Sequence, residues 1–311
     1  MATTVLTSTQ TKKFSDTDIN RTVKRAIDLL GFNFSDQIET VIIKPNLCYY
    51  WDYSTGETTD PRVVSAAIDY VRDQTSKDVK ILIAEADASA MKTKYSFKIL
   101  GYEKLSRTKN VKLVNLCDTE LNFTKVKVQD KEFELPISKL LLNPALIINM
   151  PKLRTHNVTG VTCALKNMFG AIAKPRKYDY HKMLSYVIVG VNKIVRSDIT
   201  LVDGIIARGS HPKKLGVILA GDNPLATDFI AAKIMGFNPK RIQYLNLAQK
   251  EKIGDFTSIK LIEDQIELRE VKTAFPSENF LLHKLSWNMQ LKMLKLYIAL
   301  VGDVVPPVLN S

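Results

Sequence analysis

Residues 40–86 read TVIIKPNLCYYWDYSTGETTDPRVVSAAIDYVRDQTSKDVKILIAEA, and this stretch indicates the fold. It begins with an apolar strand at 40–44 and ends with a second apolar strand at 79–86. Between them, Asp60 and Pro61 are placed to start a helix, because Asp is a favoured N-cap and Pro is tolerated at the first helical position. Strand, helix and strand in this order form the unit from which parallel sheets are built.

The rest of the chain repeats this alternation of helices and apolar strands. Asp16 or Asp18 is expected to cap the first helix, and Gly31 is placed to end it, because a left-handed residue can terminate a helix. Apolar strands separated by helices predict an α/β fold with a mostly parallel sheet that helices cover on both faces. Further helices are expected at 95–102, 183–195 and 223–236, and further strands at 111–116, 145–150, 199–205 and 215–221.

Two segments near the start and middle of the chain depart from this pattern. Residues 123–136 alternate between polar and apolar types and turn at Gln129-Asp130, which predicts a β-hairpin inserted into the α/β core. Residues 1–13 are mostly polar and are expected to form a flexible tail without a secretory signal. The α/β domain is therefore expected to span 14–275, as one body or as two lobes.

The C-terminal segment, residues 276–311, is predicted to be helical and amphipathic. Its polar stripe contains Lys284, Lys292 and Lys295 at helical spacing. Three lysines in such a stretch disfavour a membrane-spanning helix. The segment can lie on an acidic membrane or pack on protein, and we expect packing within the chain or in a homodimer.

Composition restricts the class of protein. The chain has 311 residues, a net charge of +12 and three cysteines without CxxC spacing. This cysteine pattern disfavours a disulfide framework and an internal zinc or iron–sulfur site, and it fits a reducing cytoplasm. We therefore predict a cytoplasmic protein, with peripheral membrane association as an open alternative, and no metal site.

Positive charge is concentrated between residues 151 and 215. This stretch contains twelve lysines and arginines against three aspartates, a net charge of +9. Such a field attracts anions, which can be a carboxylated or phosphorylated metabolite, a nucleic acid or an acidic membrane surface.

Polar residues also follow several predicted strands. Ligands of open α/β sheets bind outside the carboxyl ends of the strands, so these side chains are expected to meet at one crevice. The plainer alternative is that strands usually end in polar loops. The residues in question are Lys44, Asn46, Glu85, Asp87, Lys152, Asp203 and Asp222.

Residues 149–170, NMPKLRTHNVTGVTCALKNMFG, combine several cationic and polar side chains with no acidic residue. Lys152, Arg154 and His156 alternate, so in an extended segment they point to one side. Thr159 and Gly160 precede a predicted helix whose first backbone N–H groups are expected to be free to bind an anion. That helix carries Lys166 and Asn167. A solvated basic loop is the alternative interpretation.

Three of these residues are candidates for acid/base chemistry. His156 has a reference pKa near neutrality, and neighbouring cations favour its neutral form. Lys166 or Lys44 beside other cations can have a lowered pKa and act as a base or nucleophile. A loop histidine and purely binding lysines are the alternatives.

Nucleotide signatures are absent from the sequence. The segment GVTCALKN lacks the second glycine and the Ser/Thr of a Walker A loop, and no GxGxxG follows a strand. The cofactor is therefore unknown, with neither ATP nor a dinucleotide supported.

Four ordered segments resemble the signatures of domain of unknown function 362. They are residues 43–64, with KPN at its start, residues 84–105, residues 148–170, with PKLRTH and LKNMFG, and residues 201–236, with AGDNPLATD. The resemblance implies an uncharacterised α/β protein. Many members carry a ferredoxin-type iron–sulfur domain with cysteine-rich motifs. Because no such motif occurs in these 311 residues, we expect a stand-alone form that a separate ferredoxin-type protein can serve.

Two functional hypotheses follow. The first is a cytoplasmic enzyme that binds a small anionic metabolite at the strand ends and carries out acid/base or redox chemistry. The second is a nonenzymatic protein that binds nucleic acid or an acidic membrane surface through residues 151–215, although that stretch lacks a nucleic-acid-binding signature.

Overall fold

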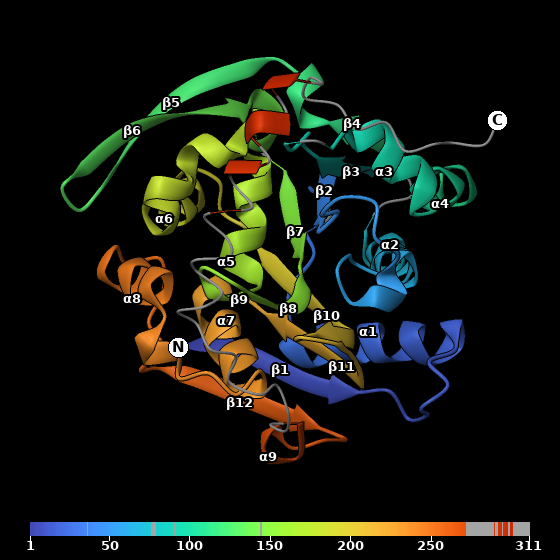
Figure 1. Ribbon diagram of the computed structural model, residues 1–311. Coiled ribbons are helices and arrows are strands. Elements are labelled where there is room, and N and C mark those ends of the chain that lie inside the picture. The colour runs from blue at the N-terminus through green and yellow to red at the C-terminus, as the bar shows by residue number, and fades with distance from the viewer. Residues whose placement is uncertain are drawn as a thin grey trace.

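The computed structural model describes residues 1–271 except 36, 76–78, 90 and 144, together with 289, 292, 293, 295–297, 299 and 300. Within this part of the chain, ten strands form one sheet in the order β12-β1-β11-β10-β7-β2-β3-β4, with β8 beside β10 and β9 beside β8 (Figure 1). The strands are β1 (Ala2–Ser8), β2 (Thr40–Pro45), β3 (Lys80–Glu85), β4 (Lys112–Asn115), β7 (Leu146–Met150), β8 (Lys152–His156), β9 (Gly160–Thr162), β10 (Ile199–Arg208), β11 (Pro212–Gly221) and β12 (Ile259–Asp264).

The sheet is mixed but mostly parallel, which confirms the predicted fold class. The run β10-β7-β2-β3-β4 is parallel throughout, as are the pairs β1–β12 and β8–β10. Antiparallel pairing occurs where β11 lies between β1 and β10, and between β8 and β9. The carboxyl ends of β2, β3 and β7 therefore open on the same edge of the sheet.

Helices cover both faces of the sheet, as predicted (Figure 1). Alternate residues of one strand enter different cores: Val41 and Ile43 pack with α1 and α2, whereas Ile42 joins the core on the opposite face. On the first face lie α1 (Asp16–Leu30), α2 (Pro61–Gln74), α3 (Thr93–Ile99) and α4 (Tyr102–Lys109), and on the second α5 (Ala164–Asn167), α6 (Leu184–Ile194), α7 (Pro224–Ile234) and α8 (Gln243–Lys250).

Shorter elements complete the chain. A further helix, α9 (Leu268–Val271), follows β12. The 3₁₀ helices are η1 (Tyr53–Thr55), η2 (Leu116–Asp118), η3 (Lys139–Leu141), η4 (Met168–Ala171), η5 (Lys177–Met183) and η6 (Pro239–Arg241).

Helix boundaries follow the local capping signals in most cases. Asp60 caps α2 with Pro61 at the first helical position, and Gly31 ends α1 in the left-handed conformation, as predicted. The cap of α1, however, is Ser15, whose side chain accepts a hydrogen bond from the Asp18 N–H. The single helix expected at 95–102 is also wrong, because left-handed Gly101 separates α3 from α4.

The predicted flexible tail is wrong as well. Residues 2–8 form β1, which lies between β11 and β12, and Val5 and Leu6 are completely buried on opposite faces. Threonine, valine and leucine side chains fit a pleated, buried surface, so the segment is a strand despite its polar composition. The N-terminus is thus part of the main sheet.

The inserted hairpin is confirmed. Strands β5 (Leu121–Val128) and β6 (Lys131–Ser138) form a separate two-stranded sheet with the turn at Gln129-Asp130, and Figure 1 shows it arching beyond α6. It packs closely on that helix, since a Cβ added to Gly190 would lie 2.7 Å from the Phe133 ring.

The described residues between 289 and 300 are helical, as predicted. The ammonium of Lys295 lies 5.4 Å from the ring centroid of Tyr178. Met289, Met293 and Leu300 are more than half exposed, so these side chains do not show the expected packing within the chain. The homodimer contact stays a prediction, and residues 276–288 and 301–311 lie outside the described part.

Candidate functional site

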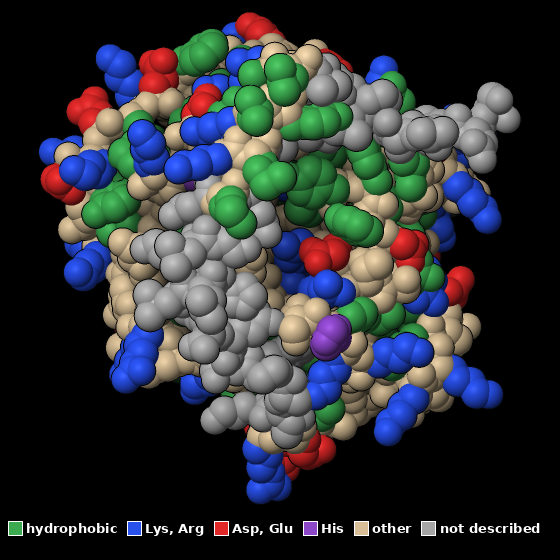
Figure 2. All heavy atoms as spheres, viewed as in Figure 1, with side chains coloured by type: hydrophobic (Ala, Val, Ile, Leu, Met, Phe, Trp, Pro, Cys, Tyr) green, Lys and Arg blue, Asp and Glu red, His purple; other side chains and the backbone are tan. Residues whose placement is uncertain are grey.

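A pocket of about 900 Å³ lies at the edge of the sheet where β2 and β3 end. Figure 2 shows the hollow with lysine and arginine side chains inside it and apolar side chains along part of its rim. Of the residues predicted to form the site, Lys44, Asn46, Glu85, Arg154, His156, Lys166 and Asn167 line this pocket, whereas Lys152, Thr159, Gly160 and Asp203 do not. The structure therefore brings about two thirds of these residues together around one pocket.

Lys152 and Asp203 form an ion pair in the interior instead. Their charged atoms are 2.8 Å apart, and both side chains are completely buried. The Asp203 carboxylate also accepts hydrogen bonds from the backbone N–H groups of Asp60, at 2.8 Å, and Ile205, at 3.0 Å. This pair fixes the start of α2 against β8 and β10, and neither residue reaches the pocket to bind a substrate.

The expected free N–H groups at the start of the helix are also contradicted. Residues 160–162 form β9, with Gly160 at φ 80°, and α5 begins only at Ala164. The N–H groups of Ala164 and Leu165 donate to the buried carboxylate of Asp228, at 2.6 and 3.1 Å. Burial raises the pKa of Asp228 to about 7. Asp228 thus occupies the position that the sequence suggested for a bound anion.

Lys44 and Glu85 form one wall of the pocket from adjacent parallel strands. The Lys44 ammonium is 2.9 Å from the Glu85 carboxylate and donates to the Pro45 carbonyl at 3.1 Å. Gly170 packs directly against this pair, because a Cβ there would lie 2.6 Å from the Lys44 ammonium and 2.7 Å from a Glu85 oxygen. The ion pair therefore depends on a glycine at this position.

The two asparagines predicted to bind substrate also position the pocket wall. The Asn167 amide donates to the Lys44 carbonyl at 3.1 Å and to the Asn149 side chain at 2.7 Å, which fixes α5 against β2 and β7. The Asn46 amide donates to the Glu57 carbonyl at 2.8 Å and so shapes the loop after β2.

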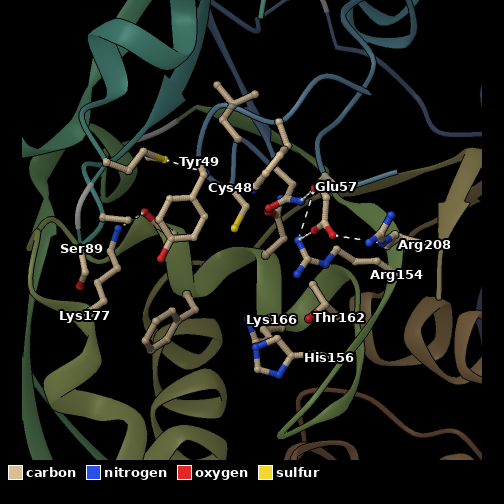
Figure 3. Close-up of a pocket in the computed structure, with 18 of the residues that line it drawn as sticks. Cys48, Tyr49, Glu57, Ser89, Arg154, His156, Thr162, Lys166, Lys177 and Arg208 are labelled. Atoms are coloured by element: carbon tan, nitrogen blue, oxygen red, sulfur yellow. Dashed lines mark hydrogen bonds and ion pairs between the residues drawn. The ribbon is translucent and has the colours of Figure 1, made fainter. Parts of the chain in front are cut away.

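Glu57 lies between two arginines at the opposite side of the pocket (Figure 3). Its carboxylate is ion-paired with Arg154 and lies 3.3 Å from the Arg208 Nε. The Nε of Arg154 is buried and makes no hydrogen bond within the described part of the chain. One carboxylate between two guanidinium groups leaves this side of the pocket positively charged.

Lys166 and Lys177 are the two pocket lysines with lowered pKa values. Burial lowers the pKa of Lys166 to about 8, and the charge of Arg154 contributes. Burial lowers the pKa of Lys177 to about 8 as well. Their surroundings differ: Lys177 donates to the Asp87 carbonyl at 2.8 Å, whereas the Lys166 ammonium has no hydrogen bond or ion pair with any residue that the structure describes.

His156 lies beside Lys166 in the pocket (Figure 3). Its Nδ1 faces the N–H groups of Val158 and Thr159, at 3.2 and 3.3 Å, and accepts from them. Burial, with the charges of Lys166 and Arg154, holds the pKa of His156 well below its usual range. A neutral imidazole with an accepting Nδ1 carries its proton on Nε2, so this arrangement favours a hydrogen-bond donor over the predicted base.

Several pocket residues were not singled out from the sequence: Tyr49, Glu57, Lys177, His181 and Arg208. Tyr49 and Glu57 lie in the segment 43–64 that resembles the family signature, and this was the signal that could have identified them. Tyr49 has φ 58°, an uncommon conformation for a bulky residue, and burial raises its pKa to about 12. Its phenol therefore stays protonated near neutral pH.

Two further features bear on the kind of site. Among the described residues, no group of three or more histidine, cysteine or acidic side chains could hold a metal ion. Cys48 lines the pocket, whereas Cys163 is completely buried outside it. Within the same residues, we find no helix with the length and apolar character needed to cross a membrane.

The fold and the site define an α/β protein with a cationic pocket at the carboxyl edge of a mostly parallel sheet. The chain belongs to the family described as domain of unknown function DUF362, whose model matches residues 41–233.

Two known proteins are similar to the chain. A thylakoid-associated protein of Synechocystis is 24% identical over 249 residues, which are 75% of this chain and 74% of that protein. The lactate racemase apoprotein from Thermoanaerobacterium thermosaccharolyticum has a TM-score of 0.45 and 13% identity, over 73% of this chain and 56% of that chain. The chain thus spans little more than half the length of that racemase.

Proposed function

We propose that this chain is a cytoplasmic enzyme that binds a small carboxylated or phosphorylated metabolite in the pocket and carries out acid/base chemistry on it. The observation that carries this proposal is Lys166, whose ammonium faces the pocket without a hydrogen bond or ion pair in the described part of the chain. Buried charges are normally paired, because removing them from water is unfavourable. A bound anion is the partner that this site lacks.

The neighbouring groups support the same ligand. Arg154 and Arg208 line the pocket with guanidinium groups that share the single carboxylate of Glu57. These donors can bind carboxylate or phosphate oxygens by charge-assisted hydrogen bonds. Lys44 is the weaker candidate for chemistry because Glu85 and the Pro45 carbonyl already hold its ammonium.

The alternative of a nucleic-acid or membrane-surface binder has less support. Within the basic stretch, Lys152, Arg154, Lys174, Lys193 and Arg208 are paired with acidic side chains. Lys166 and Lys177 lie in the pocket wall. Much of the charge counted in residues 151–215 is therefore not displayed as an exposed basic patch.

Two finer predictions remain proposals. A redox version of the chemistry, served by an external ferredoxin-type protein, rests on the family resemblance alone. Peripheral membrane association rests on the composition of the C-terminal segment, and a similar protein of Synechocystis is thylakoid-associated.

The test compares anion binding by the wild type, Lys166→Met and Lys182→Met. Lys182 is exposed, so its replacement removes the same charge without changing the pocket. Titration calorimetry with sulfate, inorganic phosphate, oxalate and pyruvate should show binding of at least one anion to the wild type and to Lys182→Met. Loss of the Lys166 ammonium should weaken that binding by about tenfold or more, as for a charge-assisted hydrogen bond.

Three results would count against the proposal. Equal anion affinity in the wild type and Lys166→Met would remove the role of Lys166. Failure of all four anions to bind the wild type would remove the anion site itself. Salt-sensitive binding of generic duplex or single-stranded nucleic acid without anion binding would favour the alternative class.

A further inference from the structure

Lys166 and Lys177 form a natural comparison within one pocket. Both ammonium groups are held in the pocket wall, but their hydrogen bonding differs. Lys177 donates to the carbonyls of Asp87, at 2.8 Å, and Gly170, at 3.5 Å, so its nitrogen is held as a donor. Lys166 has no such bond among the described residues. An amine whose nitrogen is not fixed by carbonyl oxygens is free to turn its lone pair toward a ligand.

The surroundings of Lys166 favour the neutral amine. Arg154 and His156 flank it, and a second positive charge beside a guanidinium is unfavourable. Apolar side chains, including Leu47, Met91 and Phe169, complete the pocket wall. Because its pKa is about 8, roughly one Lys166 side chain in ten is neutral at pH 7 and about half at pH 8.

We propose that Lys166 is an amine nucleophile that forms an imine with a small oxo acid, a compound with a carbonyl group next to a carboxylate. This inference rests on the proposed function, because the carboxylate is the anion that the pocket binds. Arg154 lines the pocket and is placed to hold the carboxylate through its guanidinium, which shares the single Glu57 carboxylate with Arg208. The carbonyl carbon then faces Lys166 rather than solvent.

The chemical step balances without an oxidant or a reductant. The Nζ lone pair attacks the carbonyl carbon, the carbonyl oxygen takes up a proton, and loss of one water molecule leaves a C=N bond to Lys166. The leaving hydroxyl group needs a proton, which the phenol of Tyr49 in the pocket lining can donate. Of the two protons that Nζ loses, one ends on the departing water and the other restores the phenol. Arg154 holds the substrate, and Lys166 forms the covalent bond.

The test is reductive trapping on the full-length protein at pH 8 with pyruvate and cyanoborohydride, followed by peptide mass spectrometry. Hydride from the reagent reduces the imine, so the modified peptide gains the mass of pyruvic acid less one oxygen atom. We expect labelling of Lys166 to be about tenfold or more faster than that of the exposed Lys182, because an ordinary lysine is almost fully protonated at this pH. Methyl pyruvate, which lacks the carboxylate, should label Lys166 more slowly than pyruvate does.

Lys177 is the internal control, because burial lowers its pKa to about 8 as well. Equal labelling of Lys177 and Lys166 would overturn the proposal, since the pKa alone would then explain the reaction. Labelling spread over exposed lysines would overturn it too. Mapping on the wild type needs no variant, and Lys166→Arg, which keeps the charge, should remain folded and unlabelled.

The outcomes also separate this inference from the proposed function. If sulfate, oxalate or pyruvate binds through Lys166 and no adduct forms, the imine is refuted and the anion site stands. If no anion binds and no adduct forms, both fail. If pyruvate binds and a single adduct maps to Lys166, both are supported.

Discussion

Replacement of Lys166 by methionine should make the protein more stable while it weakens anion binding. The protein lowers the pKa of Lys166 from 10.5 to about 8, and each pKa unit corresponds to about 1.4 kcal/mol. Keeping this charge in the folded state at pH 7 therefore costs up to about 3 kcal/mol. The side chain is only half-buried and pocket water reduces the cost, so we expect a gain of about 1–3 kcal/mol in the free energy of unfolding.

The pH dependence gives this prediction a definite sign. The pKa of Lys166 is lower in the folded than in the unfolded state, so the unfolded state binds more protons between about pH 8 and 10.5. Stability of the wild type should therefore rise with pH across this window, and the advantage of Lys166→Met should shrink from its full value below pH 8 toward zero near pH 10.5.

Urea unfolding at pH 7 and pH 9.5, followed by circular dichroism, measures this difference. Lys44→Met is the matched contrast: it leaves Glu85 as a buried carboxylate without its cation and should lose about 3–5 kcal/mol. The exposed Lys182→Met should stay within about 0.5 kcal/mol of the wild type. A stability loss in Lys166→Met at pH 7, or a gain that does not change with pH, would refute the reasoning.

Three further predictions concern buried groups. Lys152→Met should lower the free energy of unfolding by about 3–5 kcal/mol in urea titrations, and adding Asp203→Leu should restore part of it, because no buried charge then lacks its partner. The pKa of Asp228 is raised to about 7, so the folded state binds more protons than the unfolded state between about pH 4 and 7. As the pH rises from about 4 to 7, the free energy of unfolding of the wild type should therefore fall relative to that of Asp228→Asn. Parallel pH profiles of the two proteins would contradict this. Gly170→Ala should lower the melting temperature by several degrees, since its Cβ would lie 2.6 Å from the Lys44 ammonium; an unchanged melting temperature would mean that the ion pair moves aside without loss.

Much of the fold was accessible from local sequence signals. Asp60 with Pro61, and Gly31, mark helix boundaries that the structure confirms, because capping depends on atoms within a few residues. Composition was a poorer guide at the N-terminus. Residues 2–8 look polar, yet they form β1, because pairing with β11 and β12 from the far end of the chain decides their structure.

The candidate site was likewise predictable from the sequence only in part. The sequence by itself determined β2, β3, β4, β7, β10 and β11, several helix ends and the set of polar residues that follow these strands, since these depend on side-chain periodicity and backbone capping. It did not identify β1 or β9. Only the tertiary structure decided which of those groups are already paired. Asp203 holds Lys152 and the Asp60 N–H from 51 and 143 residues away, and Asp228 reaches the start of α5 across 64 residues. The same folding leaves Lys166 half-buried without supplying a carboxylate. Because hydrogen bonding and desolvation act through space, the sequence could not distinguish this lysine from its paired neighbours.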